Sequence, residues 1–257
     1  MCPSFQATRN EQDTTRARAN VLREILTHTE QPNPFNSQAL KEVLDLCVGC
    51  KACAKECPSN VDVTAIKTEF LFQYQKDNSL TLADYLVAYM PNLYSHFTFA
   101  PWLLNGILKR KIFSNTIKKQ LRFNTHRQLP RLSKKTINRF LKKHKLQEIN
   151  QANVVLFVDE FTATTETHIA FDAHFLLTTL GYKVHLIKGN SGRAFLSKGF
   201  LNQAQKCATR LTKKLSPFIS EQIPILGIEP SAILSFRDEY QRLLHNKNVA
   251  LNLKNNT

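Results

Sequence analysis

Residues 47–58 read CVGCKACAKECP, an unbroken C-x₂-C-x₂-C-x₃-C-P run. This spacing is typical of ligands to a [4Fe–4S] cluster. Three thiolates on one tight loop, here Cys47, Cys50 and Cys53, can each reach a different iron of a cuboidal cluster, and the fourth iron needs a ligand from another position. The run therefore predicts an iron–sulfur centre, and electron transfer rather than bond-making chemistry.

Two assignments of the fourth ligand are open. Cys2 is followed by proline, as Cys57 is. The favoured assignment gives one cluster the ligands Cys2, Cys47, Cys50 and Cys53, because the last Cys of such a run serves the other cluster in two-cluster proteins. Cys57 then belongs to a second cluster, whose other three ligands are expected upstream of this chain. The alternative is a single cluster held by Cys57 and the three cysteines before it.

Other uses of the cysteines fit the sequence less well. Structural zinc sites usually separate two C-x₂-C pairs by a dozen or more residues. The N-terminal stretch MCPSFQATRNEQ has no apolar segment of a secretory signal. We therefore expect a cytoplasmic protein with reduced thiols and no disulfides. Cys207 stands alone and is predicted to be a small buried residue of a helix.

The charge is large and unevenly distributed. The 257 residues carry 35 Lys or Arg against 20 Asp or Glu, a net charge of +15. Residues 85–108 are uncharged, and residues 109–145 hold 14 Lys or Arg with no acidic residue. Prolines, asparagines and a glycine interrupt the uncharged stretch too often for a transmembrane helix. Because the stretch is rich in aromatics, it suits contact with an anionic membrane surface at the inner face of the membrane.

The same charge has other interpretations. An acidic protein, such as an electron acceptor, would also complement it. Nucleic acid is disfavoured, because no recognition motif accompanies the charge. The plainest alternative is a solvated basic face on helices that pack against the cluster domain.

The chain divides into three predicted regions, and the predicted fold class is α plus α/β. Residues 1–80 read as helices around the cysteine loop, with apolar residues at helical spacing at Val21, Leu22 and Ile25. Residues 81–150 form a basic helical connector, in which prolines at 91, 101 and 130 are expected to cut the helices short. Residues 152–245 alternate between strands and helices.

This third region predicts a small layer of parallel strands with right-handed crossovers. The expected strands are Val154–Val158, Val184–Ile187 and a third at Ile223–Leu226 that Pro224 interrupts. Helices are expected over residues 168–180 and 194–215. The last seven residues, LNLKNNT, are expected to fray.

Acidic side chains near the strand ends are weaker candidates for a site. Asp159 and Glu160 follow the first strand, where sites of α/β folds often lie, although a solvated loop pair is the plainer interpretation. The charges at residues 237–239 are expected to be solvated.

With these residues in view, the chain resembles the C-terminal, iron–sulfur half of FAD-linked 2-hydroxy-acid dehydrogenases of the D-lactate and D-2-hydroxyglutarate type. It is also similar to glycolate oxidase iron–sulfur subunits. The matching stretches are MCPSFQATRNEQDTTRARANVLREIL, CVGCKACAKECPSNVDV, SGRAFLSKGFLNQAQK and GIEPSAILSFRDEY. The resemblance implies an α-helical ferredoxin domain with two clusters, followed by a Cys-Cys-Gly domain. It also implies that electrons pass from FAD, on an upstream domain or a partner flavoprotein, to an acceptor.

The sequence departs from that family in three respects. No segment can be assigned to flavin or substrate, and the first cluster motif lacks its earlier cysteines. The Cys-Cys-Gly domain has also lost its thiols: the family's Cys-Cys-Gly-Arg corresponds to residues 190–193, Asn-Ser-Gly-Arg, and a further Cys corresponds to Ala232. Because Asn, Ser and Ala cannot replace thiolates at a soft metal, the C-terminal domain is expected to be degenerate.

Three functional hypotheses follow. The first is an iron–sulfur electron-transfer fragment or subunit that works with a flavoprotein. The second is a non-catalytic remnant or interaction module of that family, which the lost thiols favour. The third is a basic zinc protein that binds nucleic acid, which would contain zinc without sulfide and bind DNA in a salt-dependent manner.

Overall fold

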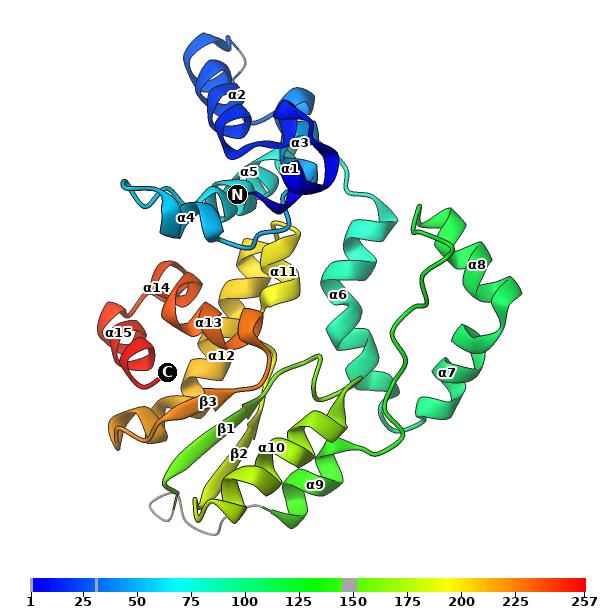
Figure 1. Ribbon diagram of the computed structural model, residues 1–257, viewed down its shortest axis with the longest axis vertical. Coiled ribbons are helices and arrows are strands. Elements are labelled where there is room, and N and C mark those ends of the chain that lie inside the picture. The colour runs from blue at the N-terminus through cyan, green and yellow to red at the C-terminus, as the bar shows by residue number, and fades with distance from the viewer. Residues whose placement is uncertain (1, 31, 145–151) are drawn as a thin grey trace. The chain divides into compact units, whose positions relative to one another are not determined.

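The computed structural model describes residues 2–30, 32–144 and 152–257 and is mostly helical, with one three-stranded sheet (Figure 1). Two compact units can be distinguished. Unit 1 comprises Met1–Thr81 with Leu196–Leu201, and unit 2 comprises Leu82–Phe195 with Asn202–Thr257. The expected class of α plus α/β agrees with this content. The division into three domains stays a prediction, and its boundary near residue 150 lies outside the described residues.

Unit 1 is built from short helices around one apolar core. The helices are α1 (Pro3–Thr8), η1 (Glu11–Asp13), α2 (Thr15–His28), α3 (Gln38–Asp45), α4 (Ala52–Glu56) and α5 (Val63–Asp77). The side chains of Thr14, Ser37 and Asp62 each accept a hydrogen bond from the backbone N–H three residues on, which fixes where α2, α3 and α5 begin. Leu40 and Phe70 are fully buried between α3 and α5, and these contacts hold the cysteine loop between the two helices.

Unit 2 begins with helices and continues as an α/β layer. Its elements are α6 (Leu82–Phe97), α7 (Pro101–Lys109), α8 (Lys111–Gln120), α9 (Ile137–Lys143), β1 (Val154–Val158), α10 (Thr167–Thr179), β2 (Val184–Lys188), α11 (Arg193–Ser197, which passes into unit 1 at Leu196), α12 (Leu201–Ser220), β3 (Ile225–Gly227), α13 (Pro230–Arg237), α14 (Glu239–Leu243) and α15 (Lys247–Asn255). No described helix is long and apolar enough to cross a bilayer.

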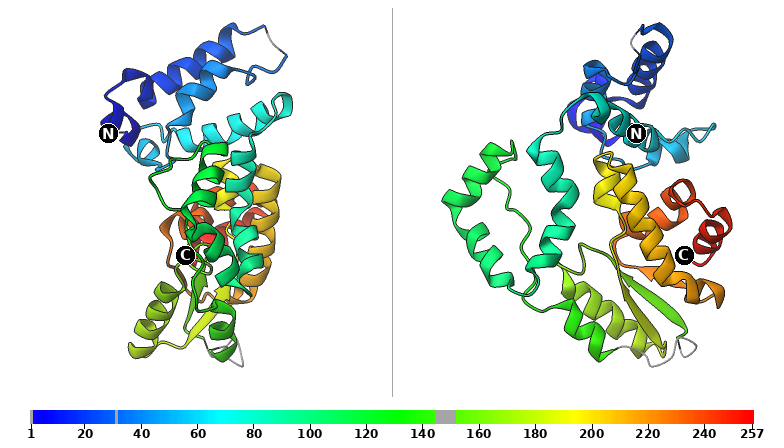
Figure 2. Two further views of the ribbon diagram at one scale, coloured as in Figure 1. Left: turned by 90° about the vertical axis from the view of Figure 1, so that its right-hand side faces the viewer. Right: turned by 180° about the vertical axis from the view of Figure 1, so that it is seen from behind.

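The sheet is parallel, with strand order β2-β1-β3. Every residue of β1 is buried, as expected for a central strand covered on both faces. α9 and α10 cover the face that carries Val154 and Leu156, and α12 and α13 cover the face that carries Phe157. Figure 2 shows α10 and α12 on opposite sides of the sheet. The carboxyl ends of the strands therefore lie at one edge, where residues 159–160 and 189–193 emerge.

Two local expectations about helices were wrong. Pro91 lies inside α6 rather than ending it, and its buried ring packs in a helix that Ala88 and Tyr94 also anchor. The helix expected over residues 194–215 is broken between α11 and α12 at Gly199, where φ is +75° and an added Cβ would lie 2.6 Å from Leu71.

The C-terminal tail does not fray. α15 is capped by Asn246, and Leu253 is fully buried. The third strand also begins later than expected, at Ile225. Pro224 therefore precedes the strand, and its carbonyl accepts a hydrogen bond from the backbone N–H of Val155. The missing N–H of the proline thus removes no hydrogen bond from the sheet.

Candidate iron–sulfur site

Two residues between the thiols of the cysteine loop have a left-handed backbone conformation. Gly49 and Lys51 adopt the left-handed region, with φ of +66° and +61°. Lys51 precedes α4, so Cys53 lies in the first turn of that helix. The backbone N–H of Cys57 closes the turn by donating to the carbonyl of Cys53 at 3.0 Å. A left-handed residue before each of Cys50 and Ala52 is what brings three thiols of a short segment to one side of the loop.

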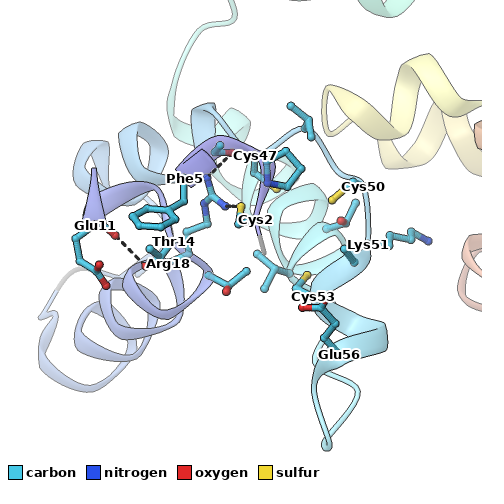
Figure 3. Close-up of a pocket in the computed structure, with 17 residues that line it drawn as sticks. Cys2, Phe5, Glu11, Thr14, Arg18, Cys47, Cys50, Lys51, Cys53 and Glu56 are labelled. Carbon is cyan, nitrogen blue, oxygen red and sulfur yellow. Dashed lines mark hydrogen bonds between the residues drawn. The ribbon is translucent and has the colours of Figure 1, made fainter. Parts of the chain in front are cut away.

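Four of the five predicted ligands surround one cavity. Cys2, Cys47, Cys50 and Cys53 all line a cavity of about 280 Å³ in unit 1 (Figure 3). Cys2 reaches it from the start of α1, and the other three from the loop between α3 and α4. Cys57 is not among the lining residues. The structure thus brings together the cysteines of the favoured assignment and leaves out the one assigned to a second cluster.

The cavity fits a group of several atoms. Its volume is well above the roughly 30 Å³ share of one water molecule. Among the described residues, no three Cys, His, Asp or Glu side chains converge closely enough to hold a single metal ion. Soft thiolates arranged around a space, rather than around a point, suit an iron–sulfur cluster.

Arg18 is a candidate site residue that sequence reasoning missed. Its side chain is only 2% exposed and donates to three groups: the carbonyl of Val43 at 3.0 Å, the hydroxyl of Ser4 at 3.1 Å and the sulfur of Cys2 at 3.2 Å. Arg18 therefore fixes Cys2 relative to α2 and α3. The available signal was its position three, four and seven residues before Val21, Leu22 and Ile25, which places it on the apolar face of α2.

Two cationic side chains, Arg18 and Lys67, form hydrogen bonds to the predicted ligands or to the backbone beside them. Burial disfavours ionisation of Cys2, but hydrogen bonds from the guanidinium of Arg18 and the backbone of Phe5 outweigh it and lower the thiol pKa below its ordinary value. Lys67 on α5 donates to the carbonyls of Asp45 and Cys47, at 3.2 and 2.8 Å. Its own pKa is lowered by burial. Hydrogen bonds and positive charge near ligand sulfurs favour the reduced form of a cluster.

Cys57 has a different environment. Backbone N–H groups of Val61 and Ser59 face its sulfur and lower the pKa of the thiol. Asn60, with φ of +52°, bends the backbone around it. Such a cradle of N–H groups stabilises a thiolate and recurs at iron–sulfur sites. Cys207 on α12 is the opposite case, because burial raises the pKa of its thiol to about 11.

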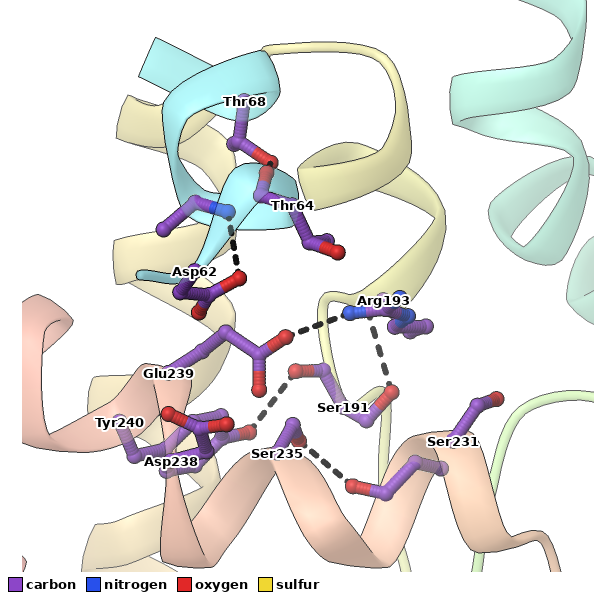
Figure 4. Close-up of polar contacts among 12 residues, drawn as sticks. Asp62, Thr64, Thr68, Ser191, Arg193, Ser231, Ser235, Asp238, Glu239 and Tyr240 are labelled. Carbon is purple, nitrogen blue, oxygen red and sulfur yellow. Dashed lines mark hydrogen bonds and ion pairs between the residues drawn. The ribbon is translucent and has the colours of Figure 1, made fainter. Parts of the chain in front are cut away.

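Ser191, one of the positions where the resemblance leads us to expect a thiol, belongs to a hydrogen-bond network in unit 2 (Figure 4). Ser191 is completely buried, and both its backbone N–H and its hydroxyl donate to the carboxylate of Glu160 at 2.8 Å. The hydroxyl of Tyr240 donates to the carbonyl of Ser191 at 2.9 Å. Arg193 pairs with Glu239 at 2.6 Å, with both side chains largely buried. Ala232 is fully buried.

The expectation of solvated charges was wrong for Asp159, Glu160 and Glu239, whereas Arg237 is exposed as expected. Asp159 is 0% and Glu160 5% exposed. The carboxylate of Asp159 is satisfied locally, since it accepts from the backbone N–H groups of Phe161 and Thr162 and from the Thr162 hydroxyl, at 2.6–3.0 Å. Glu239 is likewise buried against Arg193 rather than solvated. Glu160 depends on Ser191, 31 residues away, and no local pattern announces that contact.

Burial of Glu160 predicts a specific pH dependence of stability. Burial raises the pKa of Glu160 from its ordinary 4.5 to about 7, against the opposing hydrogen bonds from Ser191. The folded state therefore favours the protonated carboxyl more than the unfolded state does. The resulting stabilisation of the fold is complete below about pH 4.5 and is lost as the pH rises to about 7. Across this pH window, we expect the free energy of unfolding of the wild type to fall by up to about 3 kcal/mol relative to that of Glu160→Gln. Urea titrations followed by circular dichroism measure it, and parallel pH profiles of the two proteins would refute it.

Comparison with known proteins supports the N-terminal assignment. Residues 1–62 match the family of 4Fe–4S dicluster domains. The chain is 28% identical to a D-2-hydroxyglutarate dehydrogenase of Pantoea ananatis over 95% of its length, and 26% identical to those of Haemophilus influenzae and Escherichia coli over 96% and 95%. The resemblance drawn from the sequence is confirmed. The chain spans about 28% of the length of these relatives, in their C-terminal part. No solved structure matches it.

Proposed function

We propose that this chain is the iron–sulfur, electron-transfer part of a flavin-dependent 2-hydroxy-acid dehydrogenase. The observation that carries the proposal is the single cavity lined by Cys2, Cys47, Cys50 and Cys53, within a segment that matches a dicluster domain. These four thiolates hold one [4Fe–4S] cluster. When bound, the cluster supplies a one-electron relay. Arg18 and Lys67 hold its ligands in place and favour the reduced state.

Cys57 is the ligand that this chain contributes to a second cluster. Its exclusion from the cavity and its cradle of N–H groups support this role. Electrons would enter from FAD on a flavoprotein domain or subunit, as the resemblance to FAD-linked dehydrogenases implies. The D-2-hydroxyglutarate dehydrogenases to which it is similar suggest a 2-hydroxy acid as the electron source.

A polar network fills the degenerate C-terminal site, so we assign unit 2 no metal. Its role is to support the protein and to contact partners. We place the protein in the cytoplasm. Its basic residues would attract an acidic electron acceptor or an anionic membrane surface at the inner face of the membrane.

A redox cycle tests the electron-transfer function. The chain is reconstituted anaerobically with iron and sulfide, reduced with photoreduced flavin mononucleotide, and reoxidised with a water-soluble quinone. We expect the visible absorption of the cluster to bleach and recover reversibly, because the ligands surround a cavity that opens to solvent near the exposed Cys50.

The matched control is Cys47→Ala, which removes a ligand and should abolish the cycle, beside Cys207→Ala, which should preserve it. A reconstituted cluster that flavin and quinone leave unchanged would argue against electron transfer. A folded chain that takes up neither iron nor sulfide would favour the interaction module instead, and zinc without sulfide would favour the zinc protein.

A further inference from the structure

The helices α7 and α8 carry apolar side chains that the other described residues of unit 2 leave exposed. No residue of α7 is buried. The most exposed large apolar side chains are Phe99 at 85%, Ile112 at 81% and Trp102 at 74%. We call these three side chains, together with Leu103, Ile107 and Phe113, the α7–α8 face, because all six are exposed and lie within residues 99–113. Exposed apolar side chains gathered along one segment mark an interaction site.

A groove within this face combines apolar walls with a cation. It has a volume of about 510 Å³ and is lined by Trp102, Leu103, Gly106, Ile107, Arg110 and Phe113. Gly106 leaves open space at the groove, since an added Cβ would meet nothing within 4 Å. One arginine at the edge of an apolar groove matches a ligand with an anionic head and a hydrocarbon tail.

Exposed cations surround the same helices. The side chains of Lys109, Arg110, Lys111, Lys119 and Arg122 lie exposed on or next to α7 and α8. Lys118 is different, because it is buried and donates to the carbonyls of Thr125 and Arg127. No acidic residue occurs anywhere in residues 85–145. The charged residues that neighbour these apolar side chains along the chain are therefore all positive.

We propose that the α7–α8 face docks on an anionic lipid bilayer. The side chains of Phe99, Trp102 and Ile112 enter the boundary between headgroups and acyl chains, where aromatic rings are favoured. The flanking lysines and arginines contact lipid phosphates, and each contributes about fivefold to the affinity. An acidic protein would complement the charge equally well. It would not account as well for apolar side chains as exposed as these at the centre of the basic region.

This inference rests on one part of the proposed function, the attraction of the basic residues to an anionic membrane surface, and does not depend on a cluster. It concerns unit 2 alone, and the variants below leave all five predicted cluster ligands in place. Loss of membrane binding with unchanged iron and sulfide content therefore separates a failure of docking from a failure of the electron-transfer proposal.

Trp102 gives the test a site-specific signal, because it is the one tryptophan of the sequence. The full chain is mixed with vesicles of phosphatidylglycerol and phosphatidylcholine, or of phosphatidylcholine alone, at low and high salt. We expect cosedimentation and a blue shift of the tryptophan emission with the anionic vesicles at low salt, and loss of both at high salt.

Two variants and one control locate the contact. Lys109→Gln, Arg110→Gln and Lys111→Gln together should weaken vesicle binding on the order of 100-fold. Phe99→Ala with Ile112→Ala should weaken it roughly tenfold or more and reduce the blue shift. The matched control is Phe175→Ala on α10, an equally exposed aromatic at 72% outside the face, which should bind as wild type does.

Three outcomes would overturn the proposal. The chain could fail to bind anionic vesicles at low salt, or it could bind while Trp102 remains in a water-like environment. The control and the face variants could also weaken binding equally. Binding to an acidic protein with no response to vesicles would assign the face to a protein partner.

Discussion

Cys2→Ala is expected to cost the reconstituted chain its intact [4Fe–4S] cluster, whereas Cys57→Ala is expected to leave that cluster in place. The cavity is lined by Cys2 and three loop cysteines, and Cys57 lies outside it. Without Cys2, three thiolates remain, which support a three-iron centre or none. Iron and sulfide analysis with EPR of the oxidised and reduced protein distinguishes these states, and iron should fall from about four per chain to three or fewer.

Cys207→Ala is the matched control for this experiment. Its thiol lies on α12, is held protonated by burial, and should not affect iron content. The opposite pattern would replace the favoured assignment with the alternative one. In that case Cys57→Ala loses the cluster, Cys2→Ala keeps it, and the fourth ligand is Cys57.

Arg18→Ala is expected to have the largest effect of any non-cysteine substitution in unit 1. It removes a buried donor from Val43, Ser4 and Cys2 at once and leaves a cavity where the side chain was. Each buried acceptor left unsatisfied costs on the order of 1–3 kcal/mol, so we expect a loss of about 3 kcal/mol in the local stability of α1 and α2. Hydrogen exchange by mass spectrometry over peptides from residues 3–28 should then be at least 100-fold faster.

Arg16→Ala provides the control on the same helix. Arg16 pairs with Glu11 at the surface, where its side chain is 75% exposed, and such pairs contribute little. Exchange in this variant should stay within a few-fold of wild type. Equal exchange in the two variants would show that Arg18 does not anchor Cys2. Arg18→Ala should also lower the reduction potential of any cluster that it retains, because the hydrogen bond to sulfur is lost.

The cysteine loop shows what local sequence can predict. Cys47, Cys50 and Cys53 are ligand candidates from spacing alone, and the Cys-Pro form that Cys2 shares with Cys57 is enough to make it a candidate as well. The strands were equally legible, because β1 is a continuous apolar run buried on both faces. In each case, the determining interactions lie within a few residues of one another or depend on simple periodicity.

The missed features depend on distant partners or on a single ambiguous residue. Arg18 is buried because Val43 and Ser4 accept from it, and Glu160 because Ser191 donates to it. The apolar face of α2 could have indicated that Arg18 is buried, but the local pattern identifies neither the partners of Arg18 nor the partner of Glu160. Gly199 was a usable signal for the break between α11 and α12, since a glycine in a long helical stretch often ends a helix. Pro91 misled the prediction in the opposite direction, because proline usually ends a helix but lies inside α6 here.

The most direct test of the account is the iron and acid-labile sulfide content of the wild-type chain, purified and reconstituted without oxygen, together with EPR of the reduced protein. Four thiols around one cavity predict about four iron and four sulfide ions per chain and the spectrum of a single reduced [4Fe–4S] centre. A folded, colourless chain without iron, or one that holds zinc and no sulfide, would contradict it.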